Sequence, residues 1–386
     1  MPLFSSKARA RIPSRRKRSN YPYVVARIGA MRSRLLPADQ YPKLLQMDIP
    51  EIARFLEESE YKREIDELAA RFSGIDLLEL ALNLNLARTF KTILGFSEGE
   101  LSLLVSAYLR RYDAWSLKSI IRGKYYRASL DEILQTIIPA GDLTIDYLIH
   151  LAKLGSIEEV LDELRARRSI FYPPLAMAKE EFDQTKMLAP LENALDKAYY
   201  SSVFEDIEAV KGKIPEPAEM GTLTALASFF IPSSVRMFLE YFRTEIDMVN
   251  LKTLFRLKRE ALEPTEVMKH MVEGGLRLGV EQLSRLASAH SFAEFTAMLA
   301  ETYYYPDLVD AIATIEATGS LNEVEIALEK ILINTARTIS YEFPLSIAPV
   351  LWYMVRKNAE VYNLRVIARG KEARLSTDTI KKQLVI

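Results

Sequence analysis

The stretch YLRRYDAWSLKSIIRGK, residues 108–124, carries a spacing of acidic, apolar and basic residues that the chain uses three times. In each copy an acid is followed four residues later by leucine, then directly by a basic residue, and further on by arginine and lysine. The copies run Asp113–Lys124, Asp247–Lys258 and Glu360–Lys371. On a helix the acid and the leucine share one face, and the basic residues form an adjacent stripe. The spacing therefore predicts three related helices that each end in positive charge.

A second pattern precedes each basic helix and predicts the start of another helix. It reads DIPEIARFL at 48–56, SIEEVLDEL at 156–164 and SFAEFTAML at 291–299. Asp or Ser can cap a helix N-terminus, while a glutamate three residues later reaches back to it in a capping box. Because the two patterns alternate three times, we predict a triplicated helical unit of roughly 110 to 135 residues.

The remaining sequence predicts an all-α fold. Only 14 of the 386 residues are glycine, and alternating strand patterns bounded by Asn-Gly or Asp-Gly turns are absent. Proline or glycine interrupts the helical periodicity at 137–144, 210–221 and 273–279, which indicates turns between helices or domains. We expect an N-terminal arm at 1–20 and three helical repeats at 21–141, 142–273 and 274–386.

Composition indicates a large globular protein without thiol chemistry. The chain is 49% hydrophobic and 27% charged, and it contains no cysteine, so disulfides and cysteine-ligated metals are excluded. This composition favours an intracellular protein. No apolar run reaches the eighteen residues that a membrane-spanning helix needs.

The net charge of −1 hides a basic N-terminal segment and an acidic body. Ten Lys or Arg residues and no acid lie between Met1 and Ala38, which leaves 41 basic and 52 acidic residues in the rest of the chain. We interpret residues 1–20 as a disordered arm. Such an arm would contact phosphates or an anionic membrane surface, or would serve only as a solubilising extension.

Motifs for catalysis, metal binding or nucleotide binding are absent from the sequence. The three histidines, His150, His270 and His290, lack metal-ligand spacing. The tripeptide RGK at 122–124 and 369–371 lacks the glycine of a phosphate loop, and GGLRLG at 274–279 is not a dinucleotide fingerprint. We expect no catalytic residue, no metal and no cofactor.

The basic residues of the three copies are the candidate contacts for a partner. Two interpretations remain open: the charges tie helix ends together within each unit, or they form three related patches that face one partner. The nine candidates are Lys118, Arg122, Lys124, Lys252, Arg256, Lys258, Arg365, Arg369 and Lys371.

Two stretches resemble a known family. YPYVVARIGAMRSRLL at 21–36, with Tyr23, Ala26, Arg27 and Met31, and the helix carrying Tyr112 to Lys124 are similar to the C subunit of archaeal A-type ATP synthases and to the d subunit of V-type ATPases. The resemblance covers residues 21–386. The extension up to Asn20 departs from the family pattern.

The resemblance implies three similar helical subdomains arranged as a pseudo-threefold funnel. It also implies a non-catalytic central-stalk protein that joins the membrane proteolipid ring to the D and F subunits of the stalk and couples ATP synthesis or hydrolysis to proton or sodium transport. Its expected place is the cytoplasmic face of the cell membrane, held peripherally through the ring, with no nucleic acid bound.

Two other classes of function stay open from the residues themselves. One is an α-helical scaffold that binds acidic proteins or nucleic acid through its basic helices, although such scaffolds have many short repeats and this chain has few long ones. The other is a helical enzyme of unknown type, against which the missing motifs count.

Overall fold

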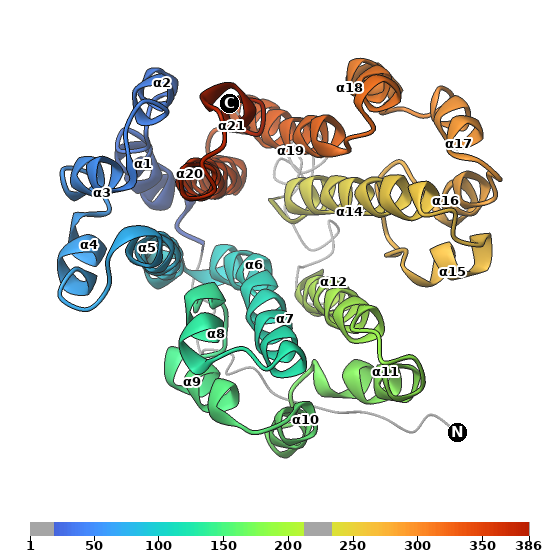
Figure 1. Ribbon diagram of the computed structural model, residues 1–386, viewed down its shortest axis with the longest axis horizontal. Coiled ribbons are helices and arrows are strands. Elements are labelled where there is room, and N and C mark those ends of the chain that lie inside the picture. Colours follow the sequence, from blue (N-terminus) through green and yellow to red (C-terminus); the bar gives the residue numbers. More distant parts are fainter. Residues whose placement is uncertain (1–18, 212–233, 386) are drawn as a thin grey trace, which may run out of the picture. The chain divides into compact units, whose positions relative to one another are not determined.

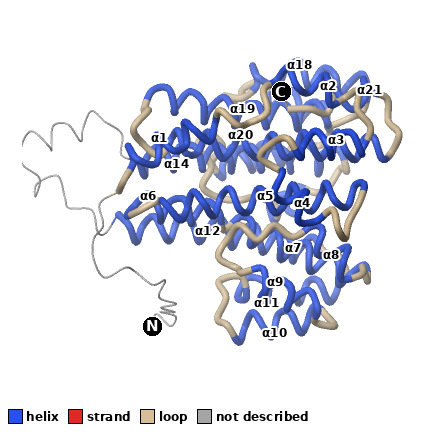
Figure 2. The backbone as a smooth tube through the Cα atoms, turned by 90° about the vertical axis from the view of Figure 1, so that its left-hand side faces the viewer, coloured by secondary structure: helices blue, strands red, loops and turns tan. Residues whose placement is uncertain are grey.

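The computed structural model describes residues 19–211 and 234–385, and these form helices and connecting turns without a strand (Figures 1 and 2). The predicted all-α class is confirmed. Residues 1–18 of the predicted basic arm lie outside the described residues. None of the described helices is both long and apolar enough to cross a membrane.

The described residues group into two compact units by their contacts. Unit 1 contains 19–20 and 91–211, and unit 2 contains 21–90 and 234–385. Helix α5 (Gly74–Phe96) begins in unit 2 and ends in unit 1. The division into three repeats, and their arrangement as a funnel, stay predictions.

Unit 1 is built around two helices near its start and one at its end. Helix α12 packs against α6, α7 and α11, while α8 and α9 lie against α7. The bounds are α6 (Gly99–Leu109), α7 (Arg111–Tyr126), α8 (Leu130–Thr136), α9 (Ile145–Lys153), α10 (Ile157–Ala166), α11 (Tyr172–Thr185) and α12 (Ala189–Lys211).

Unit 2 joins the N-terminal helices to the C-terminal ones. Helix α20 packs against α1, α3, α14, α19 and α21, and α19 also contacts α14 and α18. The N-terminal elements are α1 (Tyr21–Arg32), η1 (Ala38–Gln40), α2 (Tyr41–Leu44), α3 (Ile49–Glu57) and α4 (Lys62–Leu68). The others are α14 (Ser234–Arg259), α15 (Pro264–Lys269), α16 (Val280–Ala287), α17 (Phe292–Leu299), α18 (Tyr305–Thr318), α19 (Asn322–Glu342), α20 (Ala348–Glu372) and α21 (Thr377–Lys381).

The three cap patterns begin helices as predicted, but of the three only α3 forms the full capping box, because Glu159 and Glu294 accept the N–H of Gly155 and His290, the residue before each cap. Asp48, Ser156 and Ser291 are the N-caps of α3, α10 and α17, and each side chain accepts a hydrogen bond from the N–H of the glutamate three residues later. Such a cap contributes about 1 kcal/mol because it satisfies a helix-end N–H that has no partner within the helix.

The three copies, each running from an acid to a lysine, lie on α7, α14 and α20. Each of these helices has an apolar stripe that faces the core. The leucine of each copy is buried, at 0% exposure for Leu117 and Leu251 and 1% for Leu364. The positions three and four residues further on are also buried. Burying one such side chain stabilises the fold by about 1.5–3 kcal/mol. This stripe holds each helix in a fixed rotation and so places its charged residues.

Candidate functional site

The candidate site is a helix end that occurs three times, on α7, α14 and α20. Each helix stops in the left-handed conformation three residues after the last lysine of its copy, at Arg127, Ala261 and Arg374, with φ of 56°, 55° and 54°. In each case the next N–H donates back to the carbonyl five residues earlier, which closes the helix end. The same turn is therefore built three times from different residues.

A polar side chain on each helix clamps the segment that returns after this turn. Asn250 donates to the carbonyl of Val272 and accepts from its N–H, both at 2.8 Å. Asn363 makes the same pair of contacts with Val385, at 2.9 and 2.8 Å. In unit 1 the Ser116 hydroxyl does so with Ile138, at 3.2 Å in both directions. The clamped residue lies 22 positions after the clamp in all three copies.

The glycine of RGK lets the short helix after each turn come close. A Cβ at Gly123 would overlap the side chain of Ile133 in α8, and a Cβ at Gly370 would overlap Ile380 in α21. The second copy has Leu257 at this place, with the smaller Val267 on α15. The tripeptide thus serves helix packing.

The acid at the start of each copy is buried and accepts hydrogen bonds from another segment of the chain. We call each acid, together with the segment that it binds, a joint. Asp113 is 2% exposed, and it accepts the N–H groups of Asp142 and Leu143 at 2.8 and 3.0 Å. Burial raises the pKa of Asp113 to about 7; the two backbone hydrogen bonds lower it and the nearby Asp142 raises it further. The acid fastens the turn before α9 onto α7.

Asp247 makes the equivalent joint in unit 2 and accepts more hydrogen bonds than Asp113. It is 0% exposed and accepts the N–H groups of Leu276, Arg277 and Leu278 at 3.1, 2.7 and 3.1 Å. The Tyr304 hydroxyl donates to it at 2.7 Å. Burial raises the pKa of Asp247, while these donors lower it.

Close approach to the acid requires glycine in the first two joints. A Cβ at Gly141 would overlap the Asp113 carboxylate, and one at Gly275 would overlap Asp247. These joints were not predicted from the sequence. The signal that would have revealed them is the glycine that follows each aspartate at the same separation, 28 residues later.

Glu360 makes the third joint with residues from the other end of the chain. It accepts the N–H of Leu36, the Tyr61 hydroxyl at 2.7 Å and the Lys357 ammonium at 2.7 Å. Lys357 and Glu360 are 2% and 4% exposed as side chains, and Lys357 also lies 4.1 Å from the centre of the Tyr61 ring. The turn that follows the first two copies along the sequence is here supplied by the N-terminal segment.

The last lysine of each copy donates to backbone carbonyls of the fastened segment. Lys124 bonds the carbonyls of Ala152 and Leu154, Lys258 that of Ala289 at 2.9 Å, and Lys371 that of Leu45 at 2.5 Å. Each of these carbonyls lies close before a cap residue, Ser156, Ser291 or Asp48. Burial lowers the pKa of Lys124 and Lys258.

The other basic candidates pair mostly with acids of their own unit. Lys118 and Arg122 reach Asp196 and Glu192 on α12. Lys252 pairs with Glu325 at 2.9 Å. Arg365 and Arg369 both reach Glu79, and Arg365 also donates to Asn83 at 2.6 Å. Arg256 is exposed and makes no ion pair with the described residues. Contact of these nine residues with a partner stays a prediction.

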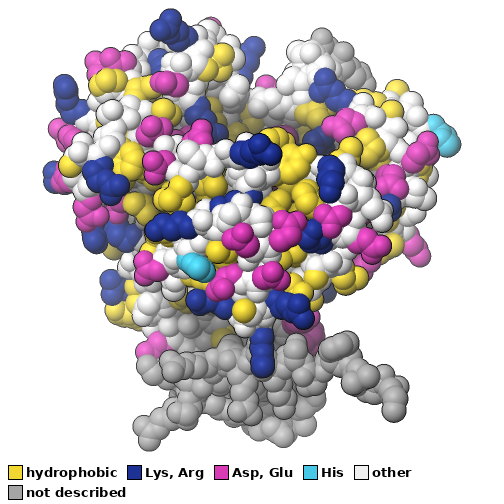
Figure 3. Space-filling view, turned by 60° about the horizontal axis from the view of Figure 1, so that its bottom comes forward, with side chains coloured by type: hydrophobic (Ala, Val, Ile, Leu, Met, Phe, Trp, Pro, Cys, Tyr) yellow, Lys and Arg dark blue, Asp and Glu magenta, His cyan; other side chains and the backbone are white. Residues whose placement is uncertain are grey.

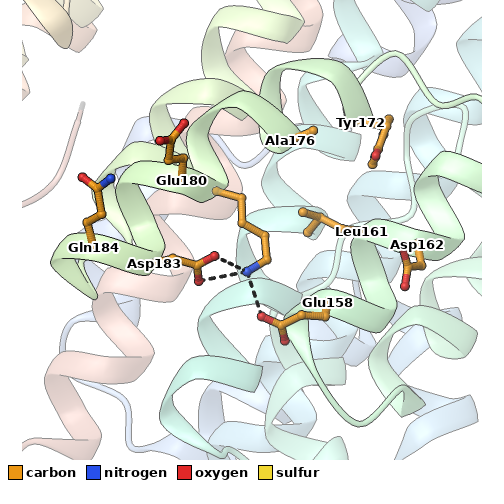
Figure 4. Close-up of a pocket in the computed structure, with 9 residues that line it drawn as sticks. Glu158, Leu161, Asp162, Tyr172, Ala176, Glu180, Asp183 and Gln184 are labelled. Carbon is orange, nitrogen blue, oxygen red and sulfur yellow. Dashed lines mark hydrogen bonds and ion pairs between the residues drawn. The ribbon is translucent and has the colours of Figure 1, made fainter.

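A hollow of about 670 Å³ lies between α10 and α11 in unit 1 (Figure 4), and Lys179 is one of the residues that line it. Lys179 is held by Asp183 at 2.7 and 2.9 Å and by Glu158 at 3.0 Å. Within 19–211 and 234–385, no cluster of three or more acidic or histidine side chains is placed to hold a metal ion. Acidic and basic side chains are interspersed on the face drawn in Figure 3.

A family model described as "ATP synthase (C/AC39) subunit" matches residues 24–383. The chain belongs to this family. Relatives in the ATP synthase C/AC39 family are named as the C subunit of A-type ATP synthase. That of Methanosarcina acetivorans is 43% identical over 95% of this chain and 93% of its own length. Those of Methanococcoides burtonii and Haloferax volcanii are 41% and 38% identical over 95% of this chain and 95% and 98% of theirs. The family match includes all three helix ends, so the triplicated joint lies inside the family's common region.

Proposed function

We propose that this chain is a non-catalytic central-stalk component of an A-type rotary ATP synthase, joining the membrane proteolipid ring to the D and F subunits of the stalk. It couples ATP synthesis or hydrolysis to proton or sodium transport, and it is held at the cytoplasmic face of the cell membrane through the ring. The observation that carries the proposal is the family match over residues 24–383, together with relatives named as the C subunit of this enzyme.

The geometry supports a mechanical role. Moving one charge through 100 mV supplies about 2.3 kcal/mol, so a rotor joint has to resist slipping under several such steps. Buried carboxylates, clamps on both N–H and C=O, and lysines bound to carbonyls fasten each of the three helices to other segments of its unit. These contacts suit a stiff connector.

The test is assembly. We expect the chain to co-purify with the ring and with the D and F subunits, and a complex lacking it to lose the link between ATP hydrolysis and ion pumping. Co-purification with neither partner would overturn the proposal. In calorimetry with Mg-ATP we expect no saturable heat, and micromolar binding would contradict a non-catalytic role.

The nine basic residues remain proposed partner contacts, and Arg256 is the first to test because it has no ion pair within the described residues. The three terminal lysines already bind carbonyls, so their joint replacement by alanine is expected to lower the melting temperature. Thermal denaturation measured beside proton pumping separates the roles: uncoupling without destabilisation would favour contact with a partner.

The helical scaffold for nucleic acid is less well supported. A nucleic-acid site gathers Lys and Arg on one face. On the one face drawn in Figure 3 both signs of charge are interspersed, and eight of the nine candidate basic side chains bond within the chain.

A further inference from the structure

Two of the three joint carboxylates accept a hydrogen bond from a tyrosine hydroxyl, and Asp113 does not. Tyr304 donates its hydroxyl to Asp247, and Tyr61 donates to Glu360, both at 2.7 Å. Each tyrosine is the N-cap of the helix that follows a capped helix, α18 after α17 and α4 after α3. The residue at the same place in unit 1, the N-cap of α11 after α10, is Phe171.

Local contacts support this equivalence. The N–H of Tyr61 and the N–H of Phe171 each lie 3.3 Å from the hydroxyl of a serine two residues earlier, Ser59 and Ser169. Tyr61 and Phe171 are 1% and 2% exposed. Phe171 therefore keeps the buried ring of this position and lacks the hydroxyl.

Asp113 is consequently held by the main chain alone. Its hydrogen-bond donors among the described residues are the N–H groups of Asp142 and Leu143. The charged groups that face it are Arg110 and the Asp142 carboxylate. Arg110 is itself paired with Asp142 at 3.4 Å and with Asp206 at 2.7 Å, so two other acids share its positive charge.

We propose that the Asp113 joint is a proton-sensitive hinge, at which the turn 139–143 opens from α7 as pH rises, while the tyrosine-bonded joint at Asp247 opens less. An ionised carboxylate that is buried without a side-chain donor gains hydration when the turn opens. A protonated Asp113 carries no such penalty and remains inside. In the stalk component proposed above, this would make one joint more compliant than the others in an alkaline cytoplasm.

The size of the effect follows from proton linkage. Burial raises the pKa of Asp113 to about 7 in the closed joint, whereas an opened, hydrated aspartate has its ordinary pKa of 3.8. The closed state then binds the proton more tightly, so the opening equilibrium grows with pH until the closed carboxyl is fully ionised. Between pH 6 and pH 8 the opening equilibrium is expected to rise about tenfold.

The experiment is hydrogen exchange on the full chain at pH 6 and pH 8, with rates converted to protection factors so that the intrinsic pH dependence is removed. Protection of peptides covering 139–143 should fall about tenfold at pH 8, while peptides covering 276–278 change less. Asp113→Asn abolishes the titration and should remove the pH dependence at 139–143.

A reciprocal pair of variants tests the role of the hydroxyl. Phe171→Tyr should reduce the pH response of 139–143, and Tyr304→Phe should increase that of 276–278 in a joint that is otherwise unchanged. Equal protection of 139–143 at both pH values in the parent chain, or an unchanged response in Asp113→Asn, would overturn the proposal. Neither outcome depends on assembly with the ring or stalk, so the proposed function is tested separately.

Discussion

The joints at Asp113 and Glu360 are made by the same position of the repeated helix pattern, but different parts of the chain close them. Asp113 binds a turn that lies 29 and 30 residues later in sequence. Glu360 binds Leu36, at a separation of 324 residues, and adds a buried ammonium and a phenol. One local motif therefore supports both a joint between neighbouring segments and a joint that fastens the two ends of the chain.

The largest expected effect is at the joint that holds the chain ends. Glu360→Ala leaves Lys357 buried at 2% exposure without its carboxylate and removes the acceptor of the Tyr61 hydroxyl. Breaking a buried pair from one side typically costs about 3–5 kcal/mol. We expect a loss of this size in chemical denaturation. A loss below about 1 kcal/mol would show that the ends are held mainly by apolar packing.

The next effect tests how closely the turn approaches its acid. Gly275→Ala places a Cβ against the Asp247 carboxylate and 2.9 Å from the carbonyl of Leu278, so the joint has to shift. We expect a loss of about 1–3 kcal/mol in the free energy of unfolding, as for other overpacked sites.

The matched control is Gly29→Ala in α1, where nothing lies within 4 Å of the added Cβ. Alanine at a helical position is favoured over glycine by up to about 1 kcal/mol, so this variant should be neutral or stabilised. Equal losses at both sites would contradict the close approach.

The third prediction concerns pH and the unequal acids. Because burial raises the pKa of Asp113 from 3.8 to about 7, the folded chain binds this proton more tightly than the unfolded chain. Its contribution is fully present below the unfolded pKa and is lost as pH rises through the folded value. The free energy of unfolding should therefore decrease between about pH 4 and pH 7 by an amount that Asp113→Asn removes.

The measurement is a denaturant titration of parent and variant at several pH values. The variant has its own cost, since asparagine offers one acceptor where the aspartate offers two. The informative quantity is therefore the change with pH of the difference between the two proteins. A difference that stays constant from pH 4 to pH 8 would mean that Asp113 titrates alike in the folded and unfolded states.

The features that could be predicted from the sequence were those that depend on neighbouring residues, namely the helix caps and the buried helix faces. Capping at Asp48, Ser156 and Ser291 depends on residues three positions apart, and the repeated acid and leucine set one face of each helix. The backbone N–H partners of the acids carry no side-chain signature, so only Gly141 and Gly275 hinted at them. The contacts of Glu360 with Leu36 and Tyr61 join residues about 300 positions apart, which no local pattern encodes.

The partners of the basic residues were likewise not predictable from local sequence. Their spacing was visible, but their partners were not, because Asp196, Glu192, Glu325 and Glu79 lie on helices distant in sequence. Each acid is one among 52 in the chain, and only packing selects it. The sequence therefore left open the choice between bracing and binding, and the ion pairs favour bracing for most of these residues.

The smallest expected effect on folding is at Arg256, and it is the sharpest test of partner contact. Arg256 is exposed on α14 and unpaired within the described residues, whereas its neighbour Lys252 pairs with Glu325 between side chains that are 45% and 42% exposed. Arg256→Ala should change the free energy of unfolding by less than about 0.5 kcal/mol, and Lys252→Ala by about 0.2–1 kcal/mol.

If Arg256 faces an acidic surface of the stalk or ring, its loss should weaken assembly. The affinity should also depend less on salt concentration, because charges at the rim of an interface act mainly through long-range attraction. Binding of parent and variant to the purified stalk proteins at low and high salt, with Lys252→Ala as the matched control, decides this. Unchanged affinity and an unchanged salt response in Arg256→Ala would leave the basic helices with a bracing role alone.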